Sequence, residues 1–193
     1  MCRRGEPDNR LQSGYNSAVQ ITLQEYRSED FELLWKIDQE CFAPGIAYSR
    51  RELEAYIRRR RAFTLVARHI RSGDKTATGE TASNDPFRGI VGFIVAETSR
   101  HGIGHIISID VLPDNRRFGI GSRLLLAAEN KLRAALCRFA VLETAVDNVA
   151  ALAFYKRHQY SVVKVVPRYY SNRIDAFMLE KSLLDDKAGG AAE

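Results

Sequence analysis

Residues 106–123 read IISIDVLPDNRRFGIGSR and predict, in order, a strand, a turn, a glycine-containing loop and the start of a helix. The segment 106–112 is rich in β-branched residues and ends at Pro113, as expected of a strand. The Pro-Asp-Asn run at 113–115 favours a turn, and a helical run follows over Arg123–Leu136. This order brings free backbone N–H groups and the positive end of a helix to one place, which predicts an anion site.

The loop that precedes this helix has the pattern Arg-x-x-Gly-x-Gly over residues 116–121. Gly119 and Gly121 lack a Cβ, so a phosphate can approach the backbone closely. A nucleotide P-loop would carry a lysine at the start of the helix, and no lysine stands there. A dinucleotide-binding fingerprint would need a third glycine where Leu124 stands. The loop therefore predicts a phosphate site of a different class.

The composition is that of an ordinary globular chain, with 193 residues, 45% hydrophobic and 27% charged. This length predicts one domain with a sizeable core. We expect no membrane span, because no apolar run reaches about 18 residues, and no secretory signal. The three cysteines are odd in number and widely spaced, which favours reduced thiols in a cytoplasmic protein over disulfides or a metal site. The net charge of +5 is compatible with an anionic cofactor.

Hydrophobic periodicity predicts a single α/β domain over residues 19–184, between a disordered tail at 1–18 and a flexible tail at 185–193. The strands at 102–112 and 139–146, with a helix between them, predict a parallel βαβ unit. The polar connection at 69–89 is long for a hairpin. In all, the sequence predicts seven strands, at 19–23, 62–68, 90–97, 102–112, 139–146, 161–166 and 174–181, and four helices, at 28–41, 49–57, 123–136 and 149–157.

Glu143 is a carboxylate in the middle of a nearly continuous apolar strand. In that setting a carboxylate loses hydration unless it is paired. Such a group is suited to take a proton from an ammonium ion, which must become a neutral amine before it can attack a carbonyl. A structural role, at a strand end or in an ion pair with an arginine, explains the residue equally well. The sequence leaves both interpretations open.

Asn148 and Tyr155 are seven residues apart, so a helix places them on one face, about 10 Å apart along its axis. A tyrosine hydroxyl at this position could protonate a thiolate leaving group. Either Asp147 or Asn148 could cap the helix, and Asn148 could also reach a neighbouring amide. The alternative for Tyr155 is a core residue whose hydroxyl reaches the surface.

Residues 147–160 read DNVAALAFYKRHQY. Together with the strand that carries Glu143 and the glycine loop, this segment resembles the acetyl-coenzyme A site of the GNAT superfamily of N-acetyltransferases. It is similar in particular to the ribosomal-protein alanine N-acetyltransferase branch, whose substrate-side hairpin resembles 168–176 and whose amine-side loop resembles 38–49. The resemblance covers about residues 19–184. It implies a single-domain GNAT fold, with a mixed sheet of about seven strands, about four helices and a central βαβ unit that binds acyl-coenzyme A.

The resemblance also implies direct acetyl transfer from acetyl-coenzyme A, with no metal. Glu143 would be the proton acceptor, and Tyr155, also in contact with the cofactor, would be the proton donor to the departing thiolate. The acceptor would be the α-amine of a protein N-terminus, such as that of a ribosomal protein with an N-terminal alanine. Neither a membrane nor nucleic acid is an expected partner. The other implied contacts are Ile109, Val111 and Asn148 with the donor's thioester and pantetheine arm, Arg116, Arg117, Gly119, Ile120, Gly121 and Ser122 with its pyrophosphate, and Phe42, Tyr48, Tyr169 and Tyr170 with the acceptor.

One departure from the family is Gln159, where the turn after the helix usually has glycine. Three other functions stay open. The acceptor could be a small amine, such as a polyamine, an amino acid or an aminoglycoside. A non-catalytic acyl-coenzyme A sensor would need neither Glu143 nor Tyr155. An RNA-associated basic protein would need an aromatic platform among its arginines, and Arg58–Arg61 instead favour a solvated helix end.

Overall fold

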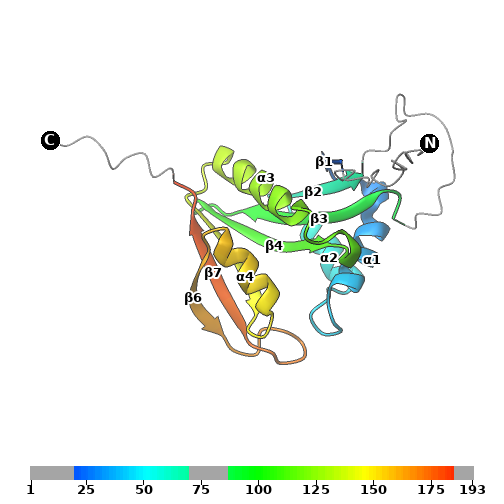
Figure 1. The fold of residues 1–193 in the computed structure, drawn as a ribbon. Coiled ribbons are helices and arrows are strands. Elements are labelled where there is room, and N and C mark those ends of the chain that lie inside the picture. Colours follow the sequence, from blue (N-terminus) through cyan, green and yellow to red (C-terminus); the bar gives the residue numbers. More distant parts are fainter. Residues whose placement is uncertain (1–19, 70–86, 185–193) are drawn as a thin grey trace, which may run out of the picture.

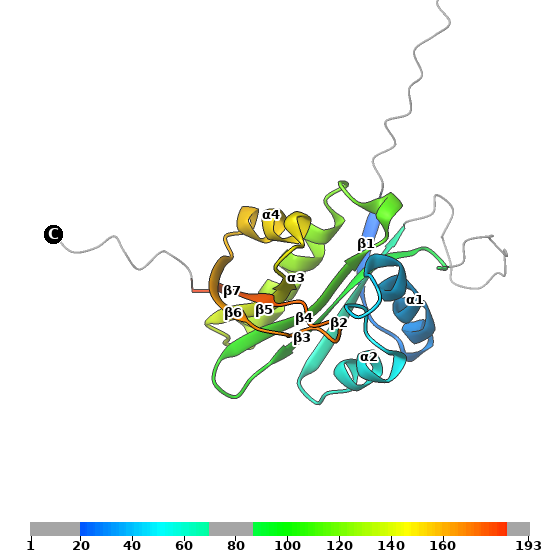
Figure 2. The same ribbon diagram turned by 90° about the horizontal axis from the view of Figure 1, so that it is seen from below.

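The computed structural model describes residues 20–69 and 87–184. The predicted tails at 1–18 and 185–193, and most of the predicted connection at 69–89, lie outside these residues. The described residues form one seven-stranded mixed sheet with helices on both faces (Figures 1 and 2). This is the α/β architecture with a single domain that the sequence predicts.

The elements follow the predicted order, with two short 3₁₀ turns in addition. The strands are β1 (Ile21–Glu25), β2 (Ala62–His69), β3 (Ile90–Thr98), β4 (Ile103–Val111), β5 (Phe139–Ala145), β6 (Ser161–Val166) and β7 (Ala176–Ser182). The helices are α1 (Phe31–Cys41), α2 (Arg50–Ile57), α3 (Ile120–Ala134) and α4 (Val149–Arg157), and the 3₁₀ turns are η1 (Ser28–Asp30) and η2 (Pro113–Asn115).

The sheet has the strand order β1-β2-β3-β4-β5-β7-β6, and its neighbours are antiparallel except for β4 and β5. That parallel pair is short, because its register ends at His105 opposite Val141. On the other side of β4, Val95 faces Ser108 and Ala96 faces Ile106, so Ile107 forms a β-bulge. The second half of β4 is therefore paired with β3 alone, and the sheet opens between β4 and β5.

Two apolar cores lie on opposite faces of the sheet (Figure 2). The face under α3 and α4 holds buried residues such as Leu124, Leu125 and Leu132. The face under α1 and α2 holds Leu34 and Leu53, both fully buried. Each helix buries one side because its apolar residues recur at helical spacing. The two layers hold β4 and β5 in place while the gap between them stays open.

Both ends of α3 differ from the prediction. The helix begins at Ile120, three residues early, because Gly119 takes a left-handed conformation with φ of 77° and acts as its N-cap. It ends at Ala134. Leu136, the last residue of the predicted helix, has φ of 61° and is 84% exposed, whereas the next residue, Cys137, is buried. The first helix also starts later than predicted, because residues from 28 to 30 form η1 and α1 begins at Phe31.

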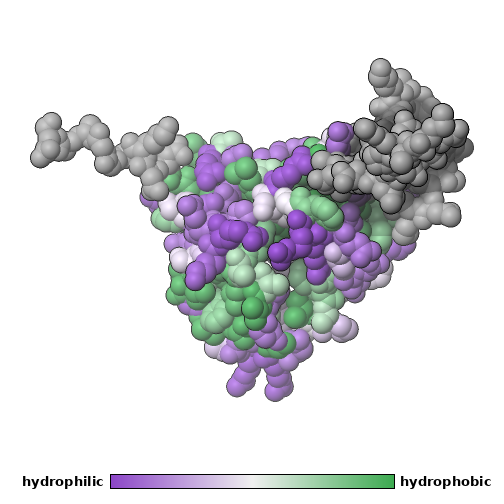
Figure 3. Space-filling view, in the orientation of Figure 1, coloured by the Kyte–Doolittle hydropathy of each residue, from purple (hydrophilic) through white to green (hydrophobic). Residues whose placement is uncertain are grey.

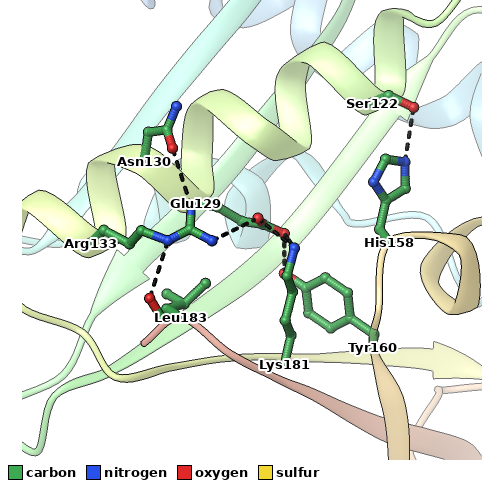
Figure 4. A network of polar contacts seen from close by, with 8 residues as sticks. All are labelled: Ser122, Glu129, Asn130, Arg133, His158, Tyr160, Lys181 and Leu183. Atoms are coloured by element: carbon green, nitrogen blue, oxygen red, sulfur yellow. Dashed lines mark hydrogen bonds and ion pairs between the residues drawn. The ribbon is translucent and has the colours of Figure 1, made fainter. Parts of the chain in front are cut away.

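A buried ion pair fixes α3 to β7, as Figure 4 shows. Glu129 is 1% exposed, and Lys181 Nζ lies 2.7 and 2.9 Å from its two carboxylate oxygens. Tyr160 donates its hydroxyl proton to Glu129 Oε1 at 3.1 Å, and Arg133 lies 3.5 Å from the other oxygen. A buried carboxylate is tolerated when it is paired in this way. The network also places Tyr160 against Tyr155, with 5.6 Å between ring centroids.

The far edge of the sheet is apolar and uncovered among the described residues. β6 lies at this edge, and Val162, Val163 and Val165 are each about half exposed. Figure 3 shows the apolar surface gathered on the lower part of this face, over α4 and the pair of β6 and β7. Lys164 interrupts the valines with a charge, which is a common protection of an edge strand.

On the face of the sheet that α1 and α2 cover, α1 lies across β4 and buries two carboxyl groups, those of Asp38 and Asp110. Asp110 Oδ2 accepts a hydrogen bond from Ser108 Oγ at 2.6 Å, and Asp38 Oδ2 accepts one from the Tyr48 N–H at 2.9 Å. The second oxygen of each carboxyl has no hydrogen-bond partner among the described residues. Burial raises the pKa of Asp38 to about 6. Burial, and then the nearby charge of Asp38, raises the pKa of Asp110 well above its ordinary range.

Replacement of Asp110 by Asn is expected to flatten the dependence of stability on pH. Because the pKa of Asp110 is higher in the folded than in the unfolded chain, its stabilising effect is complete below about pH 4 and is lost as the pH rises. That loss is at most about 1.4 kcal/mol per pH unit. Differential scanning calorimetry should show the Tm of Asp110→Asn rising relative to wild type between about pH 4 and 8.

The matched control is Asp114→Asn, because Asp114 is an exposed carboxylate in η2. It should leave the pH dependence of Tm as it is in the wild type. Parallel Tm curves for wild type and Asp110→Asn would contradict the expectation, since they would mean that Asp110 ionises at no cost in the folded chain.

Candidate functional site

The gap between β4 and β5 opens into a cleft of about 750 Å³, within the range of small-molecule sites. It runs from the N-terminus of α3 to the α1–α2 loop (42–49) and the β6–β7 loop (167–175). The structure brings every predicted site residue into the lining of this one cleft. These residues are Phe42, Tyr48, Ile109, Val111, Arg116, Arg117, Gly119, Ile120, Gly121, Ser122, Glu143, Asn148, Tyr155, Tyr169 and Tyr170.

One end of the cleft holds groups that suit an anion. The backbone N–H groups of the first turn of α3 have no acceptor within the helix, whose first bond runs from the Arg123 N–H to the Gly119 carbonyl. No atom lies within 4 Å of where a Cβ on Gly119 would stand, so the backbone is open to a ligand. Arg116 and Arg117 are exposed beside it, and Arg116 Nε donates to the Val111 carbonyl at 2.9 Å. Amides, a helix dipole and two guanidinium groups together suit a pyrophosphate.

The side chain of Ser122 is engaged within the protein. Its hydroxyl lies 2.9 Å from His158 Nε2, at the junction between α3 and the end of α4 (Figure 4). Burial, followed by the charge of Arg157, lowers the pKa of His158, so the imidazole is neutral near pH 7. Ser122 can therefore offer its backbone N–H to a phosphate, while its hydroxyl joins the two helices.

Glu143 lies at the point where β4 and β5 part. Its side chain is 11% exposed, and its Oε2 atom lies 2.7 Å from His105 Nε2. The Tyr169 hydroxyl donates to the same oxygen at 3.3 Å. The partner of Glu143 is thus a histidine and a tyrosine, not the arginine that a structural ion pair would have used. A carboxylate and an imidazole in contact form a pair that can take up and pass on a proton.

Tyr155 faces the cleft from α4 and is 6% exposed. Its ring packs edge to face against Phe154 and Tyr160, at centroid distances of 5.2 and 5.6 Å. Burial, followed by the charge of Asp110, raises the pKa of Tyr155. The hydroxyl therefore keeps its proton at neutral pH, as a proton donor must. The alternative prediction, a hydroxyl at the protein surface, does not fit this burial.

Asn148 is the residue that caps α4, since its Oδ1 accepts from the Ala151 N–H at 3.1 Å. Its side-chain amide N–H groups are left for the cleft. The helix ends in a turn where Gln159 has φ of 68°, the left-handed conformation that glycine adopts without strain. Gln159 thus adopts the turn conformation that glycine would take at this position, at a cost in backbone strain.

The other end of the cleft is lined by tyrosines from two loops that touch. Tyr48 donates its hydroxyl proton to the carbonyl of the bulged residue Ile107 at 3.2 Å. Tyr169 and Tyr170 pack edge to face, 5.0 Å between centroids. Ser171 Oγ donates to the Gly45 carbonyl at 2.9 Å, which joins the β6–β7 loop to the α1–α2 loop. These contacts form an aromatic chamber next to Glu143.

Sequence reasoning missed several residues of the lining, above all His105. The sequence places His105, a polar side chain, on the strand predicted to pair with the strand of Glu143. It does not give the register of that pair, which decides whether the two side chains meet. Asp110 and Cys41 were missed because their position beside the cleft depends on how α1 crosses β4. Tyr56 and Arg157 were missed because the sequence does not show which of their side chains face the cleft. Cys41 is not a reactive thiol, since burial raises its pKa to about 12.

No group of three or more His, Cys, Asp or Glu side chains in residues 20–69 and 87–184 could hold a metal ion. Within the same ranges, no helix has the length and apolar character needed to cross a membrane.

Residues 31–160 match the acetyltransferase (GNAT) family. A stretch of 93 residues is 41% identical to an uncharacterized N-acetyltransferase of Methanocaldococcus jannaschii, and covers 48% of this chain and 59% of that protein. A stretch of 81 residues is 37% identical to an N-alpha-acetyltransferase of Sulfurisphaera tokodaii, and covers 42% of this chain and 48% of that one. The chain thus spans about half the length of the curated relatives it matches.

The fold is similar to that of the ribosomal-protein-S18-alanine N-acetyltransferase from Escherichia coli, with a TM-score of 0.68 and 19% identity. The superposition covers 90% of this chain and 99% of that one, and at this identity it concerns the fold alone. The family match is the stronger finding, because it extends over more than half of the chain and includes the glycine loop, Glu143 and Tyr155. The chain therefore belongs to the acetyltransferase (GNAT) family.

Proposed function

We propose that this chain transfers the acetyl group of acetyl-coenzyme A directly to a primary amine, the α-amine of a protein N-terminus. The observation that carries the proposal is the contact of Glu143 with His105, 2.7 Å apart, in the cleft that Tyr155 also lines. A proton acceptor pair, a proton donor and an anion site in one cleft are the parts that this reaction needs.

The residues at the N-terminus of α3 fit the donor. The amides of Ile120, Gly121 and Ser122, together with Arg116 and Arg117, would hold its pyrophosphate. The open backbone of β4 beyond His105 would hold the pantetheine arm, and Asn148 would contact the arm from α4. When bound, acetyl-coenzyme A supplies an acetyl thioester. The protein supplies position and proton transfer, without a covalent intermediate on its own side chains.

Glu143 and His105 take the proton that the acceptor ammonium must lose. The neutral amine then forms a bond from nitrogen to the acetyl carbon while the bond from that carbon to sulfur breaks. Tyr155 gives its proton to the departing sulfur as negative charge develops there. The acetylated nitrogen loses its second proton to solvent and Tyr155 regains a proton from solvent, so that a neutral amide, a free thiol and the tyrosine hydroxyl remain. Tyr155 is 6% exposed and the Glu143 side chain 11%, whereas His105, with 30% of its side chain exposed, connects the proton acceptor pair to solvent.

The acceptor end favours a peptide because two loops and at least three tyrosines enclose it. The relative from Sulfurisphaera tokodaii is named an N-alpha-acetyltransferase, which supports an N-terminal α-amine. We further propose a ribosomal protein with an N-terminal alanine as the acceptor, and the cytoplasm as the location, from the resemblance to the alanine N-acetyltransferase branch.

The first of three predictions about the reaction concerns the acceptor. A panel of short peptides with different first residues, incubated with acetyl-coenzyme A, should release free thiol and gain one acetyl group at the α-amine by mass spectrometry. Peptides blocked at the α-amine but carrying lysine serve as the control and should stay unmodified. Acetylation of polyamines, amino acids or aminoglycosides without any peptide product would replace the peptide acceptor with a small amine.

The second prediction concerns the proton acceptors. Glu143→Gln and His105→Gln keep hydrogen-bonding groups but break the proton pathway, so kcat should fall by roughly 100-fold or more. The deficit should be largest at low pH and shrink as the pH approaches about 8, where the α-amine loses its own proton to solvent. Binding of coenzyme A, measured by calorimetry, should be retained. A pH–rate profile of Glu143→Gln identical to the wild type would remove Glu143 from this role.

The third prediction concerns the proton donor. Tyr155→Phe should lower kcat by about 10- to 100-fold and leave the Kd for coenzyme A unchanged, because only the hydroxyl is lost. Tyr160→Phe is the matched control, since it removes a buried hydroxyl that bonds Glu129 outside the cleft. That variant should lower Tm and keep kcat. Equal kcat values for Tyr155→Phe and the wild type would exclude Tyr155 as the donor.

A further inference from the structure

A second, shallower hollow of about 330 Å³ lies where the turn after α2 meets the hairpin between β3 and β4. The two segments are neighbours in Figure 2, and the Thr98 N–H donates to the Arg61 carbonyl at 3.1 Å. The hollow is lined by four arginines, one glutamate and one threonine, which we name the arginine hollow: Arg59, Arg60, Arg61, Arg100, Glu97 and Thr98.

The charge of the arginine hollow is mostly uncompensated. Arg59 pairs with Glu97 at 2.7 Å, so these two charges cancel. Arg60, Arg61 and Arg100 are exposed, and within the described part of the chain none of them forms an ion pair. Three like charges in one concave place repel one another and attract an anion. A solvated helix end, the prediction for Arg58–Arg61, does not account for Arg100, which a different hairpin brings to the same hollow.

The arginine hollow adjoins the acceptor end of the cleft through two contacts. Arg59 lies over the ring of Tyr56, 4.2 Å from its centroid, and Tyr56 packs on Tyr48 in the aromatic chamber. Glu97 lies 3.9 Å from His105 Nδ1, and His105 contacts Glu143. The arginine hollow therefore borders the side of the cleft that Tyr56 and His105 line.

The distance from Glu143 to the arginine hollow determines which residues of an acceptor peptide would reach the arginines. Successive contacts of 2.7, 3.9 and 2.7 Å link Glu143 to His105, His105 to Glu97, and Glu97 to Arg59. With the imidazole ring included, the path is as long as about three to four residues of extended chain. An acceptor whose α-amine is at Glu143 would place its fourth to sixth residues at the hollow.

We propose that the arginine hollow selects acceptor proteins with acidic side chains at about the fourth to sixth residue of their N-terminus. The inference rests on the proposed function, since it assumes a peptide in the cleft. Acidic side chains fit better than nucleic acid, because the hollow borders the aromatic chamber through Tyr56 and its described lining has no aromatic ring on which a base could stack.

The test compares two ten-residue peptides that share their first three residues, beginning with alanine, and carry either aspartate or lysine at positions 4–6. With the wild-type chain, kcat/KM for the acidic peptide should exceed that for the lysine peptide by about 10-fold or more at low salt. The ratio should fall as the ionic strength rises. The double variant Arg60→Glu/Arg100→Glu should bring the ratio to one or invert it, whereas Lys164→Glu, a charge reversal on β6, should leave it unchanged.

The outcomes separate the two proposals. Acetylation of both peptides at equal kcat/KM would overturn the acidic preference and keep the proposed function. Acetylation of neither peptide, with transfer to a small amine, would overturn both. Binding of a short single-stranded RNA that is lost in Arg60→Glu/Arg100→Glu, without a peptide preference, would make the arginine hollow a nucleic-acid surface and overturn the inference.

Discussion

The structure depends on the short pairing of β4 with β5. The two parallel strands are bonded only from Ile103 to His105, and beyond that point the sheet has no ladder between them. Backbone groups on an open strand need other partners, so this arrangement is stable where a ligand, side chains or water can reach them. Helices on both faces hold the strands apart, and the bulge at Ile107 bends β4 at the place where they separate. The cleft and the positions of the reactive side chains follow from this single divergence.

The carboxyl groups inside the molecule differ in how completely their oxygens are paired. Glu129 is buried with Lys181, Tyr160 and Arg133 around it, and this network is structural because it joins α3 to the last strands. Asp38 and Asp110 are buried with one unpartnered oxygen each, and both have raised pKa values. Glu143 lies between these extremes, partly exposed and in contact with two groups that can exchange protons. The free-energy cost of burial is thus offset by pairing at Glu129, which joins two elements of the fold. It is offset only in part at Asp38 and Asp110.

Much of the fold could be predicted, because its signals are local. Alternation and helical spacing placed all the strands and helices in their order, and the predicted start of the second helix at residue 49 agrees with the capping box that Ser49 and Glu52 form. The errors lie at the ends of elements. Gly119 caps α3 earlier than predicted, and Leu136 lies outside the helix. Both residues have the left-handed conformation, which can occur at either end of a helix, and the sequence does not show at which residue the helix begins or ends. The pairing of Asn148 with Ala151 likewise resolved a choice of cap that composition left open.

By itself the sequence determined the strand–loop–helix unit, the tyrosine two turns along α4 and the family, because each depends on residues that are neighbours in the chain. Only the tertiary structure decided what each reactive group touches. His105 and Glu143 are 38 residues apart and meet through the register of a three-residue parallel pairing. Asp38 meets Asp110 through the crossing of α1 over β4, and Arg59 meets Arg100 through two turns at one edge of the sheet. Such contacts depend on register, bulges and crossing angles, which are set by packing of the whole core and leave no local pattern in the chain.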